Sequence, residues 1–208
     1  MLKFQEFFTA CTGRWTTERT YHSVLAGEVE RSYTEFRVEA ITQEQKRQIL
    51  SLSALSGIKV TMSEQEAELP GFAIAFDTRS ETGETLSMSL QALFVPDTSV
   101  QNESVSVPPP PVAAQVPMGA DGEVIKGFYL RNEGYSEAGA ITGRFTYQAT
   151  RQTLEMTTYY RRSVAVDQMR LLAPDLRLRT IVTYQRPGES IAPSVIDLVG
   201  FGVERRQA

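Results

Sequence analysis

The second half of the chain is a series of short segments in which apolar and polar residues alternate, and this pattern limits the fold more than any other feature. A period of two residues is typical of a β-strand that buries one face. The polar or glycine-containing links between the segments are short, which favours antiparallel neighbours. The predicted strands lie near residues 123–131, 140–148, 153–162, 164–172, 176–185 and 194–205.

The first half of the chain adds two short helices and more strands. Apolar residues at helical spacing predict a helix over 2–12, and a capping-box pattern at Thr42 and Gln45 predicts a second helix over 42–55. Segments rich in threonine, tyrosine and valine predict strands near 14–25, 29–41, 58–63, 71–79 and 85–95.

A proline-rich segment near 96–118 separates the two halves. It contains four consecutive prolines, Pro108 to Pro111, which cannot join the hydrogen-bond ladder of a sheet. We expect an over-long, exposed hairpin loop that is partly in the polyproline II conformation, and a proline-recognition role is the alternative.

The strand count predicts a single all-β domain over residues 1–208, with two short helices. About ten or eleven strands in serial order must hide their edges, and closure into an antiparallel up-and-down β-barrel does this. A barrel of this size encloses a cavity that holds one small ligand. A β-sandwich is the main alternative, because strand counting alone does not separate the two architectures.

Composition argues against several classes of function. The net charge of −4 disfavours nucleic-acid binding, which needs a basic face, and no apolar run approaches the roughly 20 residues of a membrane span. The only cysteine, Cys11, permits no internal disulfide, and a single histidine offers no metal-binding cluster. We therefore expect no metal site. The N-terminus lacks the apolar core of a signal peptide, so we also expect a cytoplasmic protein.

Charged residues interrupt strands that should be apolar inside. In "APDLRLRT", Arg177 and Arg179 alternate with leucines, which places their guanidiniums about 7 Å apart on one face. Either the leucines face the core and the arginines face water, or an arginine points into a cavity and binds an anion. Asp167 lies on the preceding strand, where a buried carboxylate would cost several kcal/mol unless it is paired, and a plain ion pair with an arginine explains it most simply.

Three segments, in order along the chain, resemble the S-type phycobilin lyases of the CpcS/CpeS family. They are "FFTACTGRWTTERTYH", "GFYLRNEGYSEAGAITGRFTY" and "LAPDLRLRT". The chain has Asp175 where the family usually has Asn, and Asp167 where it usually has Glu. The resemblance implies a lipocalin-like or fatty-acid-binding-protein-like barrel with an N-terminal helix. It also implies a lyase that binds a phycobilin, most simply phycocyanobilin, as its substrate, with no tightly bound cofactor.

The same resemblance implies a partner and a set of site residues. The partner is an apo-phycobiliprotein subunit of the phycocyanin or allophycocyanin type, whose cysteine receives the pigment through a thioether, and a homodimer of the lyase is a further expectation. Arg19 and Arg179 would bind the propionates, with Arg177 assisting, because a guanidinium matches a carboxylate bidentately. Asp167 would be the catalytic residue, accepting pyrrole N–H bonds and favouring a protonated, more electrophilic pigment.

Two further residues of the first strand belong to the predicted ligand-binding set. Trp15 either lines the cavity or packs under the barrel floor, and His22 matches the family pattern without an assigned chemistry. Two other functions stay open. One is a passive carrier of an apolar carboxylate, and the other is a binding module that uses the proline-rich loop or a sheet edge.

Overall fold

The computed structural model describes residues 1–54, 57–60, 69–101, 108–115, 124–135, 137–188 and 190–207. Within these residues it has helices α1 (Phe4–Cys11) and α2 (Gln43–Ala54) and ten strands. The strands are β1 (Gly13–Ser23), β2 (Glu28–Ala40), β3 (Gly71–Ser80), β4 (Thr85–Pro96), β5 (Val124–Arg131), β6 (Ile141–Gln148), β7 (Thr153–Tyr159), β8 (Ser163–Ala173), β9 (Leu176–Gln185) and β10 (Ile196–Arg206).

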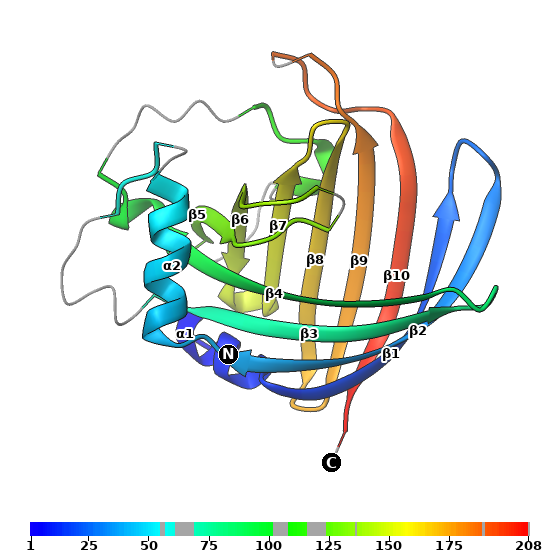
Figure 1. Ribbon diagram of the computed structural model, residues 1–208, viewed down its shortest axis with the longest axis horizontal. Helices are drawn as coiled ribbons and strands as arrows, with labels where there is room; N and C mark the ends of the chain where they lie inside the picture. The colour runs from blue at the N-terminus through cyan, green and yellow to red at the C-terminus, as the bar shows by residue number, and fades with distance from the viewer. Residues whose placement is uncertain are drawn as a thin grey trace.

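The ten strands form one closed antiparallel barrel. Each strand pairs with the next along the chain, and β10 pairs with β1 to close the sheet. This confirms the predicted up-and-down barrel and excludes the sandwich, since the hydrogen-bond ladder is continuous around the ring. Figure 1 shows β1 to β4 crossing in front of the upright strands β7 to β10.

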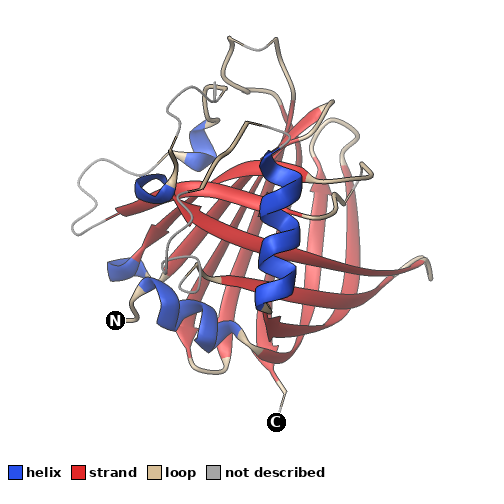
Figure 2. Ribbon diagram, turned by 60° about the vertical axis from the view of Figure 1, so that its left-hand side comes forward, coloured by secondary structure: helices blue, strands red, loops and turns tan. Residues whose placement is uncertain are grey.

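One end of the barrel, here called the floor, is closed by α1. Phe7, Phe8 and Cys11 are buried on one face of the helix, as the helical spacing of these residues predicts. The rings of Phe7 and Phe8 contact aromatic side chains inside the barrel. The centroids of the Phe8 and Phe94 rings, for example, are 4.6 Å apart. The helix gives way to β1 at Gly13, whose φ of +122° suits glycine. Figure 2 shows α1 beneath this end of the sheet.

The second helix covers the outer wall at β4 and β5 (Figure 1). The predicted capping box is present: the Gln45 N–H donates to Thr42 Oγ1, and the Thr42 N–H donates to Gln45 Oε1. Ile49 is fully buried against outward-facing residues of the barrel, including Leu93 and Leu130. The strands beneath α2 are therefore apolar on both faces, which blurs their alternation in the sequence.

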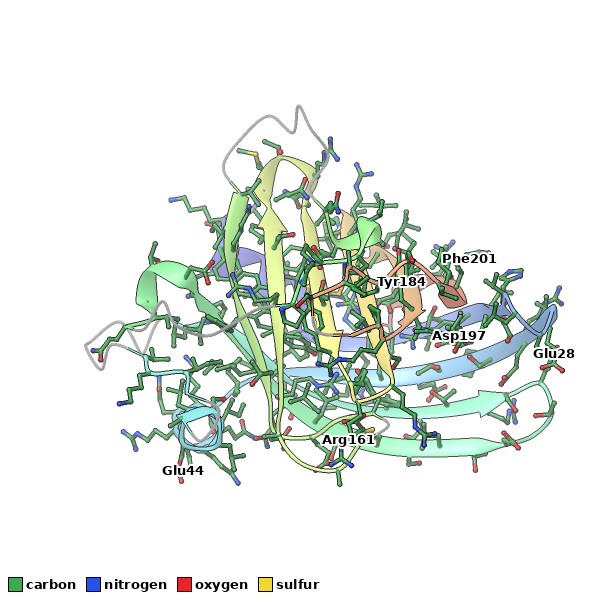
Figure 3. The ribbon with its side chains drawn as sticks, turned by 90° about the horizontal axis from the view of Figure 1, so that it is seen from above. Glu28, Glu44, Arg161, Tyr184, Asp197 and Phe201 are labelled. Carbon is green, nitrogen blue, oxygen red and sulfur yellow. The ribbon has the colours of Figure 1, made fainter. Side chains whose placement is uncertain are left out.

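The proline-rich segment differs from the exposed loop that we expected. Its first residues, 96–101, contain the end of β4 and a 3-10 turn at Asp97–Ser99. Residues 108–115 lie against the outer wall at β8 and β9, where Ala114 is buried beside Val166 and Tyr184. The Ala113 N–H donates to the Tyr184 hydroxyl, and the Gln168 side chain donates to the Ala113 carbonyl. Residues Val112–Ala114 form a short 3-10 turn, and Figure 3 shows Tyr184 beside it. Residues 102–107 and 116–118 lie outside the described part of the chain.

One predicted strand is wrong as far as the structure describes it. At 58–63, residues 58–59 have no regular structure and Val60 forms only an isolated bridge with Val100, while 61–63 lie outside the described residues. Ile58 is instead buried under α2 as part of the outer apolar cluster. No helix among the described residues is long and apolar enough to cross a membrane.

Candidate functional site

A row of inward-facing positions across three strands brings two arginines together. Arg19 on β1 is paired with Gly202 on β10, and Gly202 is paired with Arg179 on β9. A Cβ atom at Gly202 would lie 2.9 Å from Arg19 Cγ and 2.8 Å from Thr17 Oγ1. Glycine is therefore required between the two arginines, because a larger side chain would occupy the space of the Arg19 stem.

One row closer to the floor, Glu204 on β10 is paired with Arg177 on β9. Both side chains are almost completely buried, and Arg177 Nε donates to Glu204 Oε2 at 2.9 Å. The Arg177 guanidinium carbon lies 3.8 Å from the centroid of the Trp15 ring, a cation–π contact. Arg177 also donates to the carbonyl of Cys11, which ties the pair to the end of α1.

Glu204 is the anion shared by the arginines of both rows. Its Oε1 lies 3.2 Å from Arg19 Nη2 and 4.0 Å from Arg179 Nη1, while its Oε2 accepts from Arg177. Burial alone would raise the pKa of Glu204, but the three guanidiniums outweigh burial and hold the pKa below its ordinary value. Glu204 is therefore ionised and fixes the positions of the arginines around it.

Asp167 on β8 pairs with the upper side of Arg179, at 2.5 Å between Oδ2 and Nη2. Burial would lower the pKa of Arg179, but Asp167 and Glu204 raise it further, so the guanidinium remains charged. Three guanidiniums thus face two carboxylates, which leaves an excess of one positive charge in this cluster of Arg19, Arg177, Arg179, Glu204 and Asp167. Such a cluster attracts an anionic ligand.

A cavity of about 390 Å³ lies above this cluster and opens toward the barrel end opposite α1. Its charged lining consists of Arg19, Arg179, Asp167 and Glu30, and its uncharged polar lining includes Ser32, Thr34, Thr78, Tyr21 and Tyr135. Four atoms of these side chains are buried without a hydrogen-bond partner: Arg19 Nε, Arg179 Nε, Asp167 Oδ1 and Ser32 Oγ. The remaining lining is apolar: Phe36, Ile74, Phe76 and Leu86 lie on β2 to β4, and Ile181 and Leu198 lie on β9 and β10 beside the arginines. Unpaired donors and an acceptor within a largely apolar lining suit an amphipathic ligand with a carboxylate.

The structure brings together three of the six predicted site residues, Arg19, Arg179 and Asp167. Trp15 and Arg177 point inward but lie below the cavity, so the predicted ligand contact of Arg177 is replaced by its buried pair with Glu204. Trp15 takes the floor position that was its alternative. His22 does not fit the prediction: its side chain is exposed on the outer face, where it stacks on Phe201. Strand alternation sends position 22 to the opposite face from position 19.

Sequence reasoning missed Glu204 and Tyr135. Glu204 had a signal: Gly200, Gly202 and Glu204 share one face of a strand, and two glycines on an inward face indicate a close approach of other side chains. Tyr135 lies in the link between β5 and β6 and lines the cavity from there. Alternation gave no indication of this, because it places side chains only within strands; the available signal was the resemblance of the segment "GFYLRNEGYSEAGAITGRFTY", which contains Tyr135.

These features define a lipocalin-like antiparallel barrel: an up-and-down sheet, a helix at the floor and a cavity lined in part by arginines. Residues 3–106 and 111–207 match the model of a family described as "CpeS-like protein". The chain belongs to this family.

Two curated relatives carry the name "Chromophore lyase CpcS/CpeS 1". The one from Synechococcus sp. (strain JA-3-3Ab) is 39% identical over 204 residues, which cover 98% of this chain and 96% of the relative. The one from Trichodesmium erythraeum (strain IMS101) is 22% identical over 188 residues, covering 90% and 91% of the two chains. The solved S-type phycobiliprotein lyase CPES from Guillardia theta has the same fold, with a TM-score of 0.66 at 16% identity, over 100% of this chain and 94% of that chain.

Proposed function

We propose that this chain is a chromophore lyase that binds an open-chain tetrapyrrole in its barrel and promotes thioether attachment of the pigment to a cysteine of an apo-phycobiliprotein. The cavity carries this proposal. Its unpaired arginine donors lie within a largely apolar lining, which suits a pigment with a conjugated body and two propionates. Membership of the family supports the same activity.

Three charged residues of the cavity have roles in this proposal. Arg19 and Arg179 each retain an unpaired Nε–H, and they bind propionate carboxylates. Asp167 has one oxygen on Arg179 and one unpaired oxygen, Oδ1, which accepts pyrrole N–H groups. A carboxylate at this position stabilises the protonated pigment, which is the more electrophilic form.

The nucleophile in the proposed reaction belongs to the partner protein. Cys11 is the only cysteine of this chain, and it is buried at the floor, where burial raises the pKa of its thiol. The acceptor thiol adds across the ethylidene double bond of the pigment, so the sulfur bonds to the exocyclic carbon and the proton goes to the pigment. The barrel contributes by holding one conformation of a flexible substrate.

The open end of the cavity determines how the pigment is presented. The volume of about 390 Å³ lies at the small end of the range for ligand pockets, roughly 300–1,000 Å³. A long tetrapyrrole therefore extends past the rim, and the part outside meets the acceptor protein. We take phycocyanobilin as the pigment and subunits of the phycocyanin or allophycocyanin type as acceptors.

Two further expectations concern assembly and location. The outer face of β9 and β10 exposes Leu178, Phe201 and Val203, and we propose this face as the contact of a homodimer (Figure 3). Light scattering of the wild-type chain and of a Phe201→Glu variant tests this contact. We place the reaction in the cytoplasm, which the free thiol of Cys11 supports, since thiols persist in reducing compartments.

A transfer assay tests the proposed activity. Purified protein is mixed with phycocyanobilin and the apo-phycocyanin β-subunit, and attached pigment is detected by zinc-enhanced fluorescence of the denatured acceptor. Arg179→Ala and Asp167→Ala should each reduce transfer roughly tenfold or more, because each removes a charged hydrogen bond of about 1.5–3 kcal/mol. Arg170→Ala is the matched control, since Arg170 is exposed on the outer face of β8.

The same assay separates the lyase from the two other functions. A passive carrier would bind pigment but leave the fluorescent band no brighter than the spontaneous reaction does. Normal transfer by folded Arg179→Ala and Asp167→Ala variants would refute the site assignment. A binding module that uses the proline-rich loop would lose its function on deletion of residues 105–116, whereas a lyase should keep most of its transfer activity.

A further inference from the structure

Arg131, at the end of β5, is a buried cation that the proposed chemistry does not use. It is 2% exposed, and no carboxylate among the described residues lies within ion-pair distance of it. Its guanidinium carbon instead lies 4.4 Å from the ring centroid of Tyr135 and 5.7 Å from that of Tyr129. Arg131 Nη2 donates to the Tyr160 hydroxyl at 3.0 Å. Contact with aromatic rings offsets only part of the free energy that it costs to bury a cation. The burial of Arg131 therefore needs a functional explanation.

The guanidinium and the surrounding hydrogen bonds hold the link between β5 and β6 in place. Arg131 Nε donates to the carbonyl of Glu133, within the link. The Glu133 side chain in turn accepts from the Gly139 N–H, and the Glu137 side chain accepts from the Arg161 N–H of the β7–β8 turn. Arg161 marks this turn in Figure 3. The link is thus fixed both to itself and to the neighbouring turn.

Tyr135 is the residue that this link places at the cavity. Its side chain lines the cavity together with Asp167 and Arg179, yet it is 46% exposed, so it lies between the cavity and solvent. Its ring centroid lies 6.0 Å from that of Phe76, which lines the cavity from β3. Arg131 covers one face of the Tyr135 ring, which leaves the remainder of the ring available to a ligand.

We infer that Tyr135 is a specificity-determining residue of this cavity and that Arg131 is its positioning residue. Tyr135 and Phe76 form an aromatic contact at the mouth for the conjugated, planar part of the pigment, while the arginines below bind its propionates. Aromatic rings prefer flat conjugated partners in stacked or edge contacts, so this mouth favours a tetrapyrrole over a saturated chain with the same carboxylates. The inference rests on the proposed function and adds to it the element that selects the body of the ligand.

Titration of the purified full-length chain with phycocyanobilin, followed by the visible absorption of the bound pigment, tests the inference. Tyr135→Leu should weaken binding roughly fivefold, the factor that corresponds to one aromatic pair, and should shift the bound absorption band toward that of the free pigment. Tyr135→Phe should retain both affinity and band, because it keeps the ring. Tyr33→Leu is the control, since Tyr33 lies on the outer side of β2 away from the cavity.

The positioning role of Arg131 is tested without removing the buried charge. Tyr160→Phe deletes the hydroxyl that accepts from Arg131, and it should shift the band in the same direction as Tyr135→Leu but to a smaller extent. Unchanged affinity and band in Tyr135→Leu would overturn the inference while the proposed function stands. An unchanged band in Tyr160→Phe would overturn the positioning role. Failure of the wild-type chain to bind the pigment at all would overturn both the inference and the proposed function.

Discussion

Glu155 provides a quantitative prediction, because it is a carboxylate buried on the outer side of β7. Its side chain is 5% exposed, and its two oxygens accept hydrogen bonds only from hydroxyls, those of Thr157 at 2.6 Å and Thr146 at 3.1 Å. No ion pair of Glu155 is present among the described residues, although Arg151 and Arg170 line the same outer pocket. Burial raises the pKa of Glu155 to about 7 against the opposing effect of the two hydroxyls.

The raised pKa makes stability depend on pH. Because the folded pKa exceeds the unfolded value of 4.5, the protonated carboxyl stabilises the fold below pH 4.5, and this contribution is lost as pH rises through 7. At about 1.4 kcal/mol per pKa unit the whole effect is about 3 kcal/mol, of which about 2.5 kcal/mol falls between pH 5 and pH 8. Glu155→Gln keeps the size and a hydrogen-bonding oxygen without the charge, so its stability should not show this loss.

Urea unfolding at pH 5, 6, 7 and 8 measures the effect. The free energy of unfolding of Glu155→Gln minus that of the wild-type chain should increase by about 2–3 kcal/mol from pH 5 to pH 8. Glu28→Gln is the control, because Glu28 is exposed at the β1–β2 hairpin (Figure 3), and its difference from the wild type should be flat. If the Glu155→Gln difference were equally flat, the carboxyl would titrate normally and burial would not dominate its pKa.

Three further predictions concern the barrel interior. Gly202→Ala should lower the free energy of unfolding by about 1–3 kcal/mol and weaken pigment binding, because the new methyl group displaces the Arg19 stem; urea unfolding and pigment titration measure this. Glu204→Gln should cost about 3–5 kcal/mol in the same unfolding assay, because it leaves buried Arg177 without its anion. Cys11→Ser should retain pigment transfer, and loss of transfer in a folded variant would indicate a covalent lyase–pigment intermediate.

Alternation in the sequence defined the strands of the barrel but not which face of each strand lies inside. At 176–179 both assignments agree with the pattern, and the structure turns both arginines inward while Leu178 is 36% exposed. The choice depends on partners far along the chain, since Glu204 on β10 and Asp167 on β8 provide the counter-charges. A local pattern carries no information about such partners.

On the first strand, alternation separates residues that the predicted site places together. Trp15 and Arg19 differ by an even number of positions and share a face, whereas His22 lies on the other face of any regular strand. A predicted site with all three residues therefore conflicts with the alternation that predicted the strand. The floor position of Trp15 follows from its place two residues after Gly13, at the beginning of β1, where its indole N–H donates to the carbonyl of Cys11 at the end of α1.

Covering segments account for the remaining differences between prediction and structure. Ile58 has the apolar character of a strand residue but packs under α2, and residues 108–115 pack on β8 and β9 despite their prolines. Both segments fill gaps over the outer wall, which requires apolar surface but no regular hydrogen bonding. Composition predicts burial at such sites, whereas only the closed barrel determines where they lie.

The interior of the barrel connects folding and ligand binding through the same charges. Glu204 compensates three arginines incompletely, so Arg19 and Arg179 keep buried donors without acceptors, at a cost to the stability of the empty barrel. A ligand carboxylate that accepts from these donors removes this cost, and the free energy gained appears as affinity. A ligand without an anionic group cannot gain it, however well it fits the apolar lining. In the proposed function, Arg19 and Arg179 therefore select for the acid groups of the ligand, and Tyr135 and Phe76 at the mouth select for its conjugated body.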